Sequence, residues 1–163
     1  MPKQPESAAT YVLSAQIFTG SAQRLAKCFA DEKWQITNNP QAAPLYYLVS
    51  HAAELFLKAL VVSRDLRIQW EHKHDLVGLL GELEAIEVKV TPASRKVLEE
   101  LSSKHKGHSL RYDAFFVGHE GGFQSNEQQL FTMLEELERL AERKFRTGRQ
   151  RWDRLPDPDR DLR

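Results

Sequence analysis

Residues 45–61 read Leu-Tyr-Tyr-Leu-Val-Ser-His-Ala-Ala-Glu-Leu-Phe-Leu-Lys-Ala-Leu-Val, and this stretch decides the fold. Apolar side chains lie almost all round a helix drawn through it, and a helix that is apolar on every side is usually buried. Pro44 suits the first turn, because the amide N–H that proline lacks would have no helical partner there. We therefore predict a central helix over residues 44–67, with the other elements packed around it.

Helical periodicity and capping residues predict four further helices, one before this helix and three after it. Their predicted spans are 7–31, 75–86, 91–104 and 126–146. Ser7, Asp75 and Thr91 are suitable caps for the first three of them. Residues 87–90 alternate in polarity but are too few to indicate a strand, and residues 105–125 should form a long loop. The predicted fold class is all-α, an up-and-down bundle of about five helices.

The composition is that of one ordinary soluble domain. The chain has 163 residues, of which 41% are hydrophobic and 28% charged. Its 23 basic and 23 acidic residues cancel, which argues against nucleic-acid binding over the whole surface. A single cysteine, Cys28, excludes an intrachain disulfide and indicates a reducing compartment. We see neither a signal peptide nor the ~18 apolar residues of a membrane span, and expect a cytoplasmic protein that does not contact a membrane.

Three short segments stand out in order along the chain: Ser50–Leu60, which contains the pattern H-x-x-E-L-x-L-K-A, then His74–Leu76, then Leu110–Tyr112. Together they resemble the HEPN superfamily. The resemblance implies a compact helical bundle, often dimeric, of the kind found in prokaryotic toxin–antitoxin and defence systems and in RNA processing. We expect one HEPN-like domain over residues 1–154, followed by a disordered tail over residues 155–163.

Many HEPN proteins are metal-independent ribonucleases with an Arg-x(4–6)-His motif, from which this chain departs. Arg111 and His119 stand in the corresponding place, but seven residues separate them. Arg67 and His72 have a matching spacing between the second and third predicted helices, which is the wrong part of the fold. The resemblance thus implies Arg111 and His119 as candidate catalytic residues, with His108 as a weaker base. The arginine would stabilise phosphate charge and the histidine would transfer a proton.

A polar stripe interrupts the apolar central helix. His51, Glu54 and Lys58 follow the spacing i, i+3 and i+7, which puts them on one helix face. Glu54 and Lys58 are also placed in the favourable i, i+4 order for an ion pair. Two interpretations follow: a structural ion pair at the edge of the bundle, or a polar face turned towards a ligand or a dimer partner.

Further candidate ligand-binding residues lie at the start of the third predicted helix and in the long loop. Asp75 can cap that helix, while His74 beside it could act as a base near a bound phosphate. Arg111 is suited to a phosphate contact and Tyr112 to stacking on a base. Alternatively, Arg111 pairs with a carboxylate such as Glu54 and Tyr112 packs in the core.

The six histidines show no linear metal-binding motif, since no HExxH is present, and we therefore predict no metal site and no cofactor. The end of the last helix is basic, with aromatic residues interleaved, which suits either RNA binding or compensation of the helix dipole. Its basic residues are Arg143, Lys144, Arg146, Arg149, Arg151 and Arg154.

These observations favour a non-catalytic HEPN-like binding module, a homodimer that recognises RNA, a nucleotide or a protein partner. The predicted ligand-binding residues are His51, Glu54, Lys58, His74, Asp75, Arg111 and Tyr112. The alternative is a metal-independent endoribonuclease that uses Arg111 and His119. A third, weaker alternative is a structural component that assembles through its last helix.

Overall fold

The chain folds as an all-helical bundle, seen here in a computed structural model that describes residues 7–32, 36–37, 39–68, 74–105 and 123–147. Five α-helices are present in these ranges, with a short 3-10 turn η1 (Pro40–Ala42) before the second. They are α1 (Ala8–Asp31), α2 (Ala43–Val62), α3 (Leu76–Glu84), α4 (Pro92–His105) and α6 (Glu127–Thr147). The predicted all-α fold with about five helices is therefore confirmed.

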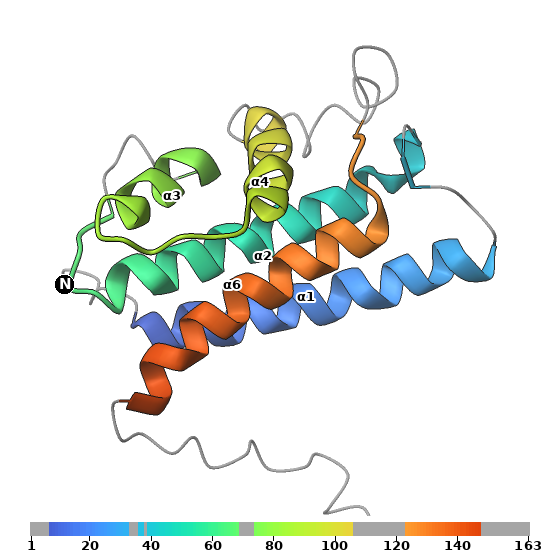
Figure 1. The fold of residues 1–163 in the computed structure, drawn as a ribbon. Helices are drawn as coiled ribbons and strands as arrows, with labels where there is room; N and C mark the ends of the chain where they lie inside the picture. Colours follow the sequence, from blue (N-terminus) through green and yellow to red (C-terminus); the bar gives the residue numbers. More distant parts are fainter. Residues whose placement is uncertain (1–6, 33–35, 38, 69–73, 106–122, 148–163) are drawn as a thin grey trace, which may run out of the picture.

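Helix α2 is the centre of the bundle, as its sequence predicts. It contacts each of the other four α-helices, and fifteen of its twenty residues are buried. Figure 1 shows α1, α2 and α6 running alongside one another, with α3 and α4 packed across α2. By length and composition α2 could cross a membrane, contrary to the expectation from sequence. However, 78% of its most apolar window is buried among the other helices, as in the core of a soluble protein.

The predicted capping residues begin the helices. Ser7 Oγ accepts a hydrogen bond from Thr10 N at 3.2 Å, and Asp75 Oδ1 accepts one from Gly78 N at 3.1 Å. At α6, Asn126 and Gln129 exchange reciprocal backbone-to-side-chain bonds of 3.0 and 2.9 Å. These bonds satisfy first-turn amides that have no partner within the helix, which fixes where the helices start.

The ends of two helices differ from the prediction. α2 stops at Val62 rather than Arg67, because Asp65 adopts a left-handed φ of 57° and Leu66 N then bonds back to Val61 O. Likewise α3 stops at Glu84 rather than at residue 86, and Glu87 adopts a φ of 64°. No strand forms over residues 87–90. Hydrogen-bonded turns therefore end both helices, although the apolar periodicity of the sequence continues for a few more residues.

Two carboxylates, the buried Glu136 and the half-buried Glu100, attach α4 to its neighbours. Glu136 of α6 accepts hydrogen bonds from Thr91 N at 2.8 Å and Ser94 Oγ at 2.5 Å at the beginning of α4. Glu100, further along α4, accepts from Ser125 N at 3.1 Å and from the amide of Gln124. The backbone that enters α6 is therefore fixed to α4.

Candidate functional site: a carboxylate surrounded by three histidines

Glu54 is the centre of a polar cluster inside the bundle. The residue is only 1% exposed, although its side chain is a carboxylate. One of its oxygens, Oε1, pairs with the ammonium of Lys58, one turn later on α2 and itself 7% exposed. The ion pair predicted from the i, i+4 spacing is thus present. It lies in the core rather than at the edge of the bundle, since both side chains are buried.

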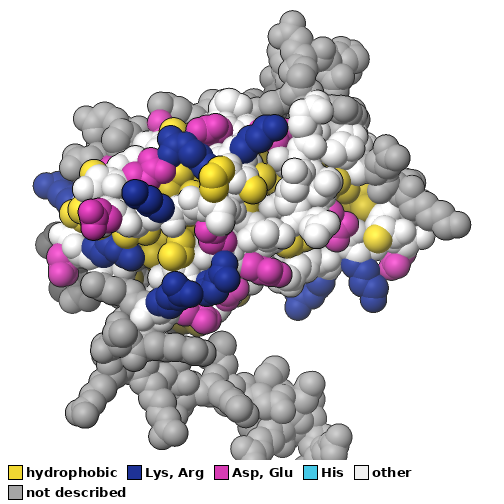
Figure 2. Space-filling model, in the orientation of Figure 1, with side chains coloured by type: hydrophobic (Ala, Val, Ile, Leu, Met, Phe, Trp, Pro, Cys, Tyr) yellow, Lys and Arg dark blue, Asp and Glu magenta, His cyan; other side chains and the backbone are white. Residues whose placement is uncertain are grey.

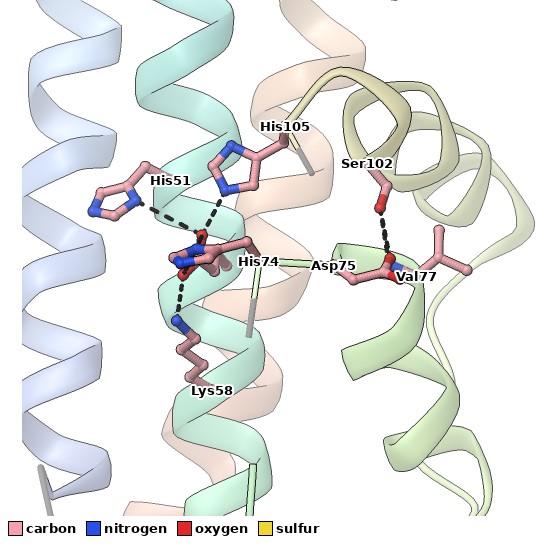
Figure 3. Close-up of polar contacts among 8 residues, drawn as sticks. His51, Lys58, His74, Asp75, Val77, Ser102 and His105 are labelled. Carbon is pink, nitrogen blue, oxygen red and sulfur yellow. Dashed lines mark hydrogen bonds and ion pairs between the residues drawn. The ribbon is translucent and has the colours of Figure 1, made fainter. Parts of the chain in front are cut away.

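Three histidines from three parts of the chain surround the same carboxylate (Figure 3). His105 Nε2, at the end of α4, lies 2.5 Å from Glu54 Oε2. His74 Nδ1, just before α3, lies 3.3 Å from both carboxylate oxygens. His51 Nδ1, one turn earlier on α2, lies 3.9 Å from Oε2, which is ion-pair distance but not hydrogen-bond distance. The Glu54 cluster is hereafter His51, Glu54, Lys58, His74 and His105.

The cluster has a buried side and a partly open side. The side chain of His105 is 4% exposed, whereas those of His51 and His74 are 21% and 35% exposed. The imidazole of His51 meets the ring of Phe18 edge-on at 4.4 Å and stacks on that of Tyr47 at 5.9 Å. These two rings restrict the orientation of His51. Because His51 and His74 are the more exposed histidines, solvent reaches the cluster at these two residues.

The electrostatics keep Glu54 ionised. Burial penalises the carboxylate and by itself raises its pKa, but the hydrogen bond from His105 and the charge of Lys58 outweigh that effect. The pKa of Glu54 falls from its ordinary value of 4.5 to about 2. Since an ionised carboxylate can only accept hydrogen bonds, Nε2 of His105 carries the proton in their 2.5 Å contact.

This lowered pKa gives the stability of the fold a definite pH dependence. Because the pKa of Glu54 is lower in the folded than in the unfolded protein, ionised Glu54 stabilises the fold. This stabilisation is complete above about pH 4.5 and is lost as the pH falls through about 2. We expect urea unfolding to show about 3 kcal/mol of stability lost over that window on account of Glu54. Glu136, whose pKa is also lowered, contributes with the same sign and remains in Glu54→Gln. An unchanged acid slope in Glu54→Gln would contradict the assignment to Glu54.

Asp75 does not belong to the cluster, and its predicted role as a cap is confirmed. Besides Gly78 N, its Oδ1 accepts a hydrogen bond from Ser102 Oγ of α4 at 3.0 Å. Ser102 Oγ in turn accepts one from Val77 N at 3.3 Å, as Figure 3 shows. Asp75 thus ties the start of α3 to α4, which places the neighbouring His74 beside Glu54.

The other predicted site residues lie outside the described part of the chain. They are Arg111, Tyr112 and His119, with the weaker candidate His108, and the predicted tail 155–163 also lies outside the described residues. Of the basic segment that begins near the end of α6, only the side chain of Arg143 is described, and it is exposed. The predicted catalytic pair and the contacts of Arg111 therefore stay predictions.

His105 is a site residue that is not among the predicted ligand-binding residues, because it was expected to lie in the long loop. The structure makes it the last residue of α4. A signal was available in the periodicity, since Leu98, Leu101 and His105 follow one another at helical spacings of three and four. The helix therefore ends one residue later than predicted, and this last residue, His105, lies beside Glu54.

Phe123 resumes the described chain after residue 122 and is held against α2. Its ring stacks on that of Tyr46, with centroids 3.6 Å apart and planes 10° from parallel. Tyr46 also donates a hydrogen bond of 3.0 Å to Ser125 O. Both residues that flank positions 106–122 thus contact α2, His105 at Glu54 and Phe123 at Tyr46. Eight residues of helix, a rise of ~12 Å, separate those two contacts.

Comparisons of the chain with known protein families, with curated protein sequences and with solved structures find no match.

Proposed function

We propose that this chain is a HEPN-like, non-catalytic binding module whose ligand carries phosphate, namely RNA or a nucleotide. The observation that carries the proposal is the Glu54 cluster, in which α2, α4 and the residue before Asp75 contribute three imidazoles and an ammonium around one carboxylate. Imidazole N–H groups are hydrogen-bond donors suited to phosphate oxygens. A purely structural ion pair would not require three histidines beside it.

The charge of the cluster suits an anionic ligand. A bare carboxylate would repel phosphate, but Lys58 compensates the charge of Glu54. His51 and His74 occupy the solvent-accessible side, where a ligand could meet them. The face of the molecule drawn in Figure 2 carries basic and acidic side chains interspersed. Binding would therefore depend on a local site rather than on a large basic surface.

The segment that carries Arg111 and Tyr112 connects two residues that contact α2. It follows His105 directly along the chain and ends at Phe123, and both of these are fixed to α2. The proposal gives Arg111 a phosphate contact and Tyr112 a stacking contact with a base. A protein partner is the competing ligand class, and it predicts no binding of RNA or nucleotide.

Three further expectations belong to the same proposal. The resemblance to HEPN proteins supports a homodimer, a cytoplasmic location and a role in a prokaryotic toxin–antitoxin or defence system. Sedimentation velocity of the purified chain measures the oligomeric state directly. The ribonuclease alternative rests on Arg111 and His119 and is the less favoured one, because their spacing departs from the motif.

The test is RNA binding by His74→Ala, since His74 is the most exposed histidine of the cluster. We expect fluorescence anisotropy with a labelled RNA to show about tenfold weaker binding, equivalent to the loss of one charge-assisted hydrogen bond of ~1.4 kcal/mol. Lys96→Ala is the matched control, because Lys96 is exposed on α4 and lies nine residues, ~13 Å, from His105.

Equal losses in His74→Ala and Lys96→Ala would indicate non-specific charge attraction and would contradict the proposal. So would the absence of RNA and nucleotide binding by the folded wild-type protein. Circular dichroism of each variant establishes that the helical fold is retained. The salt dependence of binding should be shallow, because few phosphates are contacted by a local site.

A further inference from the structure

We propose that His51, Glu54 and His105 form a binding site for a divalent transition metal, of which Zn²⁺ is the most suitable. One donor atom of each residue lies within 4.8 Å of the other two. The nitrogens that face Glu54 Oε2 are His51 Nδ1 and His105 Nε2. Two imidazole nitrogens and one carboxylate oxygen are the ligand set of zinc sites that keep a fourth position open. The site goes beyond the proposed function and does not rest on it.

The spacing of the donor atoms is close to what zinc requires. Tetrahedral coordination with bonds of ~2.0–2.1 Å places neighbouring ligand atoms about 3.3 Å apart. Glu54 Oε2 lies 2.5 Å from His105 Nε2 and 3.9 Å from His51 Nδ1, one distance shorter and one longer than this value. These two distances have to change by less than ~1 Å to reach tetrahedral spacing. The distance between the two histidine nitrogens is at most 4.8 Å and has to change by no more than about 1.5 Å, which rotations of the side chains can supply.

The surroundings provide the second set of contacts that metal ligands usually have. A ligating carboxylate is commonly hydrogen-bonded through its other oxygen, and Lys58 occupies Oε1 of Glu54. The rings of Phe18 and Tyr47 orient His51. His74 Nδ1 is outside the set of three but lies 3.3 Å from Glu54, which makes it the nearest described histidine to an open fourth position.

The same atoms also explain why no metal site was predicted from the sequence. His51 and Glu54 are three residues apart on one helix, but His105 is 51 residues from Glu54 in the chain. Linear motifs find ligands that share one helix or one loop. In this protein the third ligand belongs to α4, and its position beside Glu54 depends on the packing of α4 against α2.

The metal-free cluster and the metal site differ in which ring nitrogen of His105 carries the proton. In the hydrogen-bonded state its Nε2 carries a proton that Glu54 accepts. Coordination requires Nε2 to be unprotonated, so the neutral imidazole must carry its proton on Nδ1 instead. No redox change or co-reactant is involved. Zn²⁺ simply replaces the proton between the two side chains.

The experiment is calorimetric titration of the tag-free, metal-stripped full chain with Zn²⁺ alone, in parallel with thermal unfolding. We expect one Zn²⁺ per chain and a melting temperature that rises with Zn²⁺ concentration. His51→Gln should bind at least about 100-fold more weakly, since loss of even an outer contact costs 10–100-fold. His51→Asp, which restores a carboxylate ligand, should recover most of the affinity.

Cys28→Ser is the matched control, because Cys28 is an exposed free thiol that could bind zinc by itself. The proposal requires this variant to bind as wild type does. It is overturned if folded wild-type protein binds no Zn²⁺ at about 100 μM, a weak affinity for a three-ligand site. It is equally overturned if Cys28→Ser loses binding or if His51→Gln retains it. None of these outcomes depends on RNA.

Discussion

Replacing Glu54 with leucine is expected to lower the free energy of unfolding by about 3–5 kcal/mol. The variant leaves the ammonium of Lys58 buried without its counter-charge and deprives His105 of its acceptor. Removing one partner of a buried pair costs far more than the pair contributes. Urea unfolding followed by circular dichroism measures the change.

The double variant Glu54→Leu/Lys58→Met is the control for this interpretation. It replaces the buried pair by apolar side chains and removes the uncompensated charge, so we expect it to recover at least about 2 kcal/mol relative to Glu54→Leu. Full recovery is not expected, because His105 Nε2 still lacks its acceptor. If the double variant were as unstable as the single one, lost packing rather than the buried charge of Lys58 would be the cause.

Replacing Phe123 with alanine is expected to cost about 3–5 kcal/mol, because the side chain is fully buried and stacks on Tyr46. The loss also frees the backbone that Glu100 holds at Gln124 and Ser125. Amide hydrogen exchange at those two residues should therefore accelerate more than exchange in the middle of α1. Urea unfolding gives the global cost.

Phe123→Leu separates the two effects of Phe123→Ala. Leucine keeps most of the apolar volume, so we expect a cost below about 1.5 kcal/mol and near-normal exchange at Ser125. If RNA binding depends on the segment between His105 and Phe123, it should weaken in the alanine variant and persist in the leucine variant. Equal stability of the two variants would contradict the role given to the stack with Tyr46.

Local sequence determined most of the fold. The apolar circumference of α2 predicts its central position, and Ser7 and Asp75 predict where two helices begin, because capping acts over three residues. The ends of α2 and α3 were less predictable. Asp65 and Glu87 adopt left-handed φ values that these residue types only sometimes take, and apolar periodicity continues beyond both.

The site was predictable only in part, because its contacts are long-range. The i, i+4 spacing predicts the pair of Glu54 and Lys58, but nothing local shows that both are buried. His74 and His105 reach Glu54 across 20 and 51 residues of chain, through the packing of α3 and α4 on α2. Their convergence is a property of tertiary packing, which a single sequence does not display.

The most direct test of the central claim, that the chain binds RNA or a nucleotide without catalysis, exposes a pool of single-stranded and structured RNA to the folded wild-type protein without added metal. We expect the protein to retain RNA from the pool and the RNA to remain intact after prolonged incubation. Cleavage that is lost in Arg111→Ala or His119→Ala would contradict it and would establish the ribonuclease alternative.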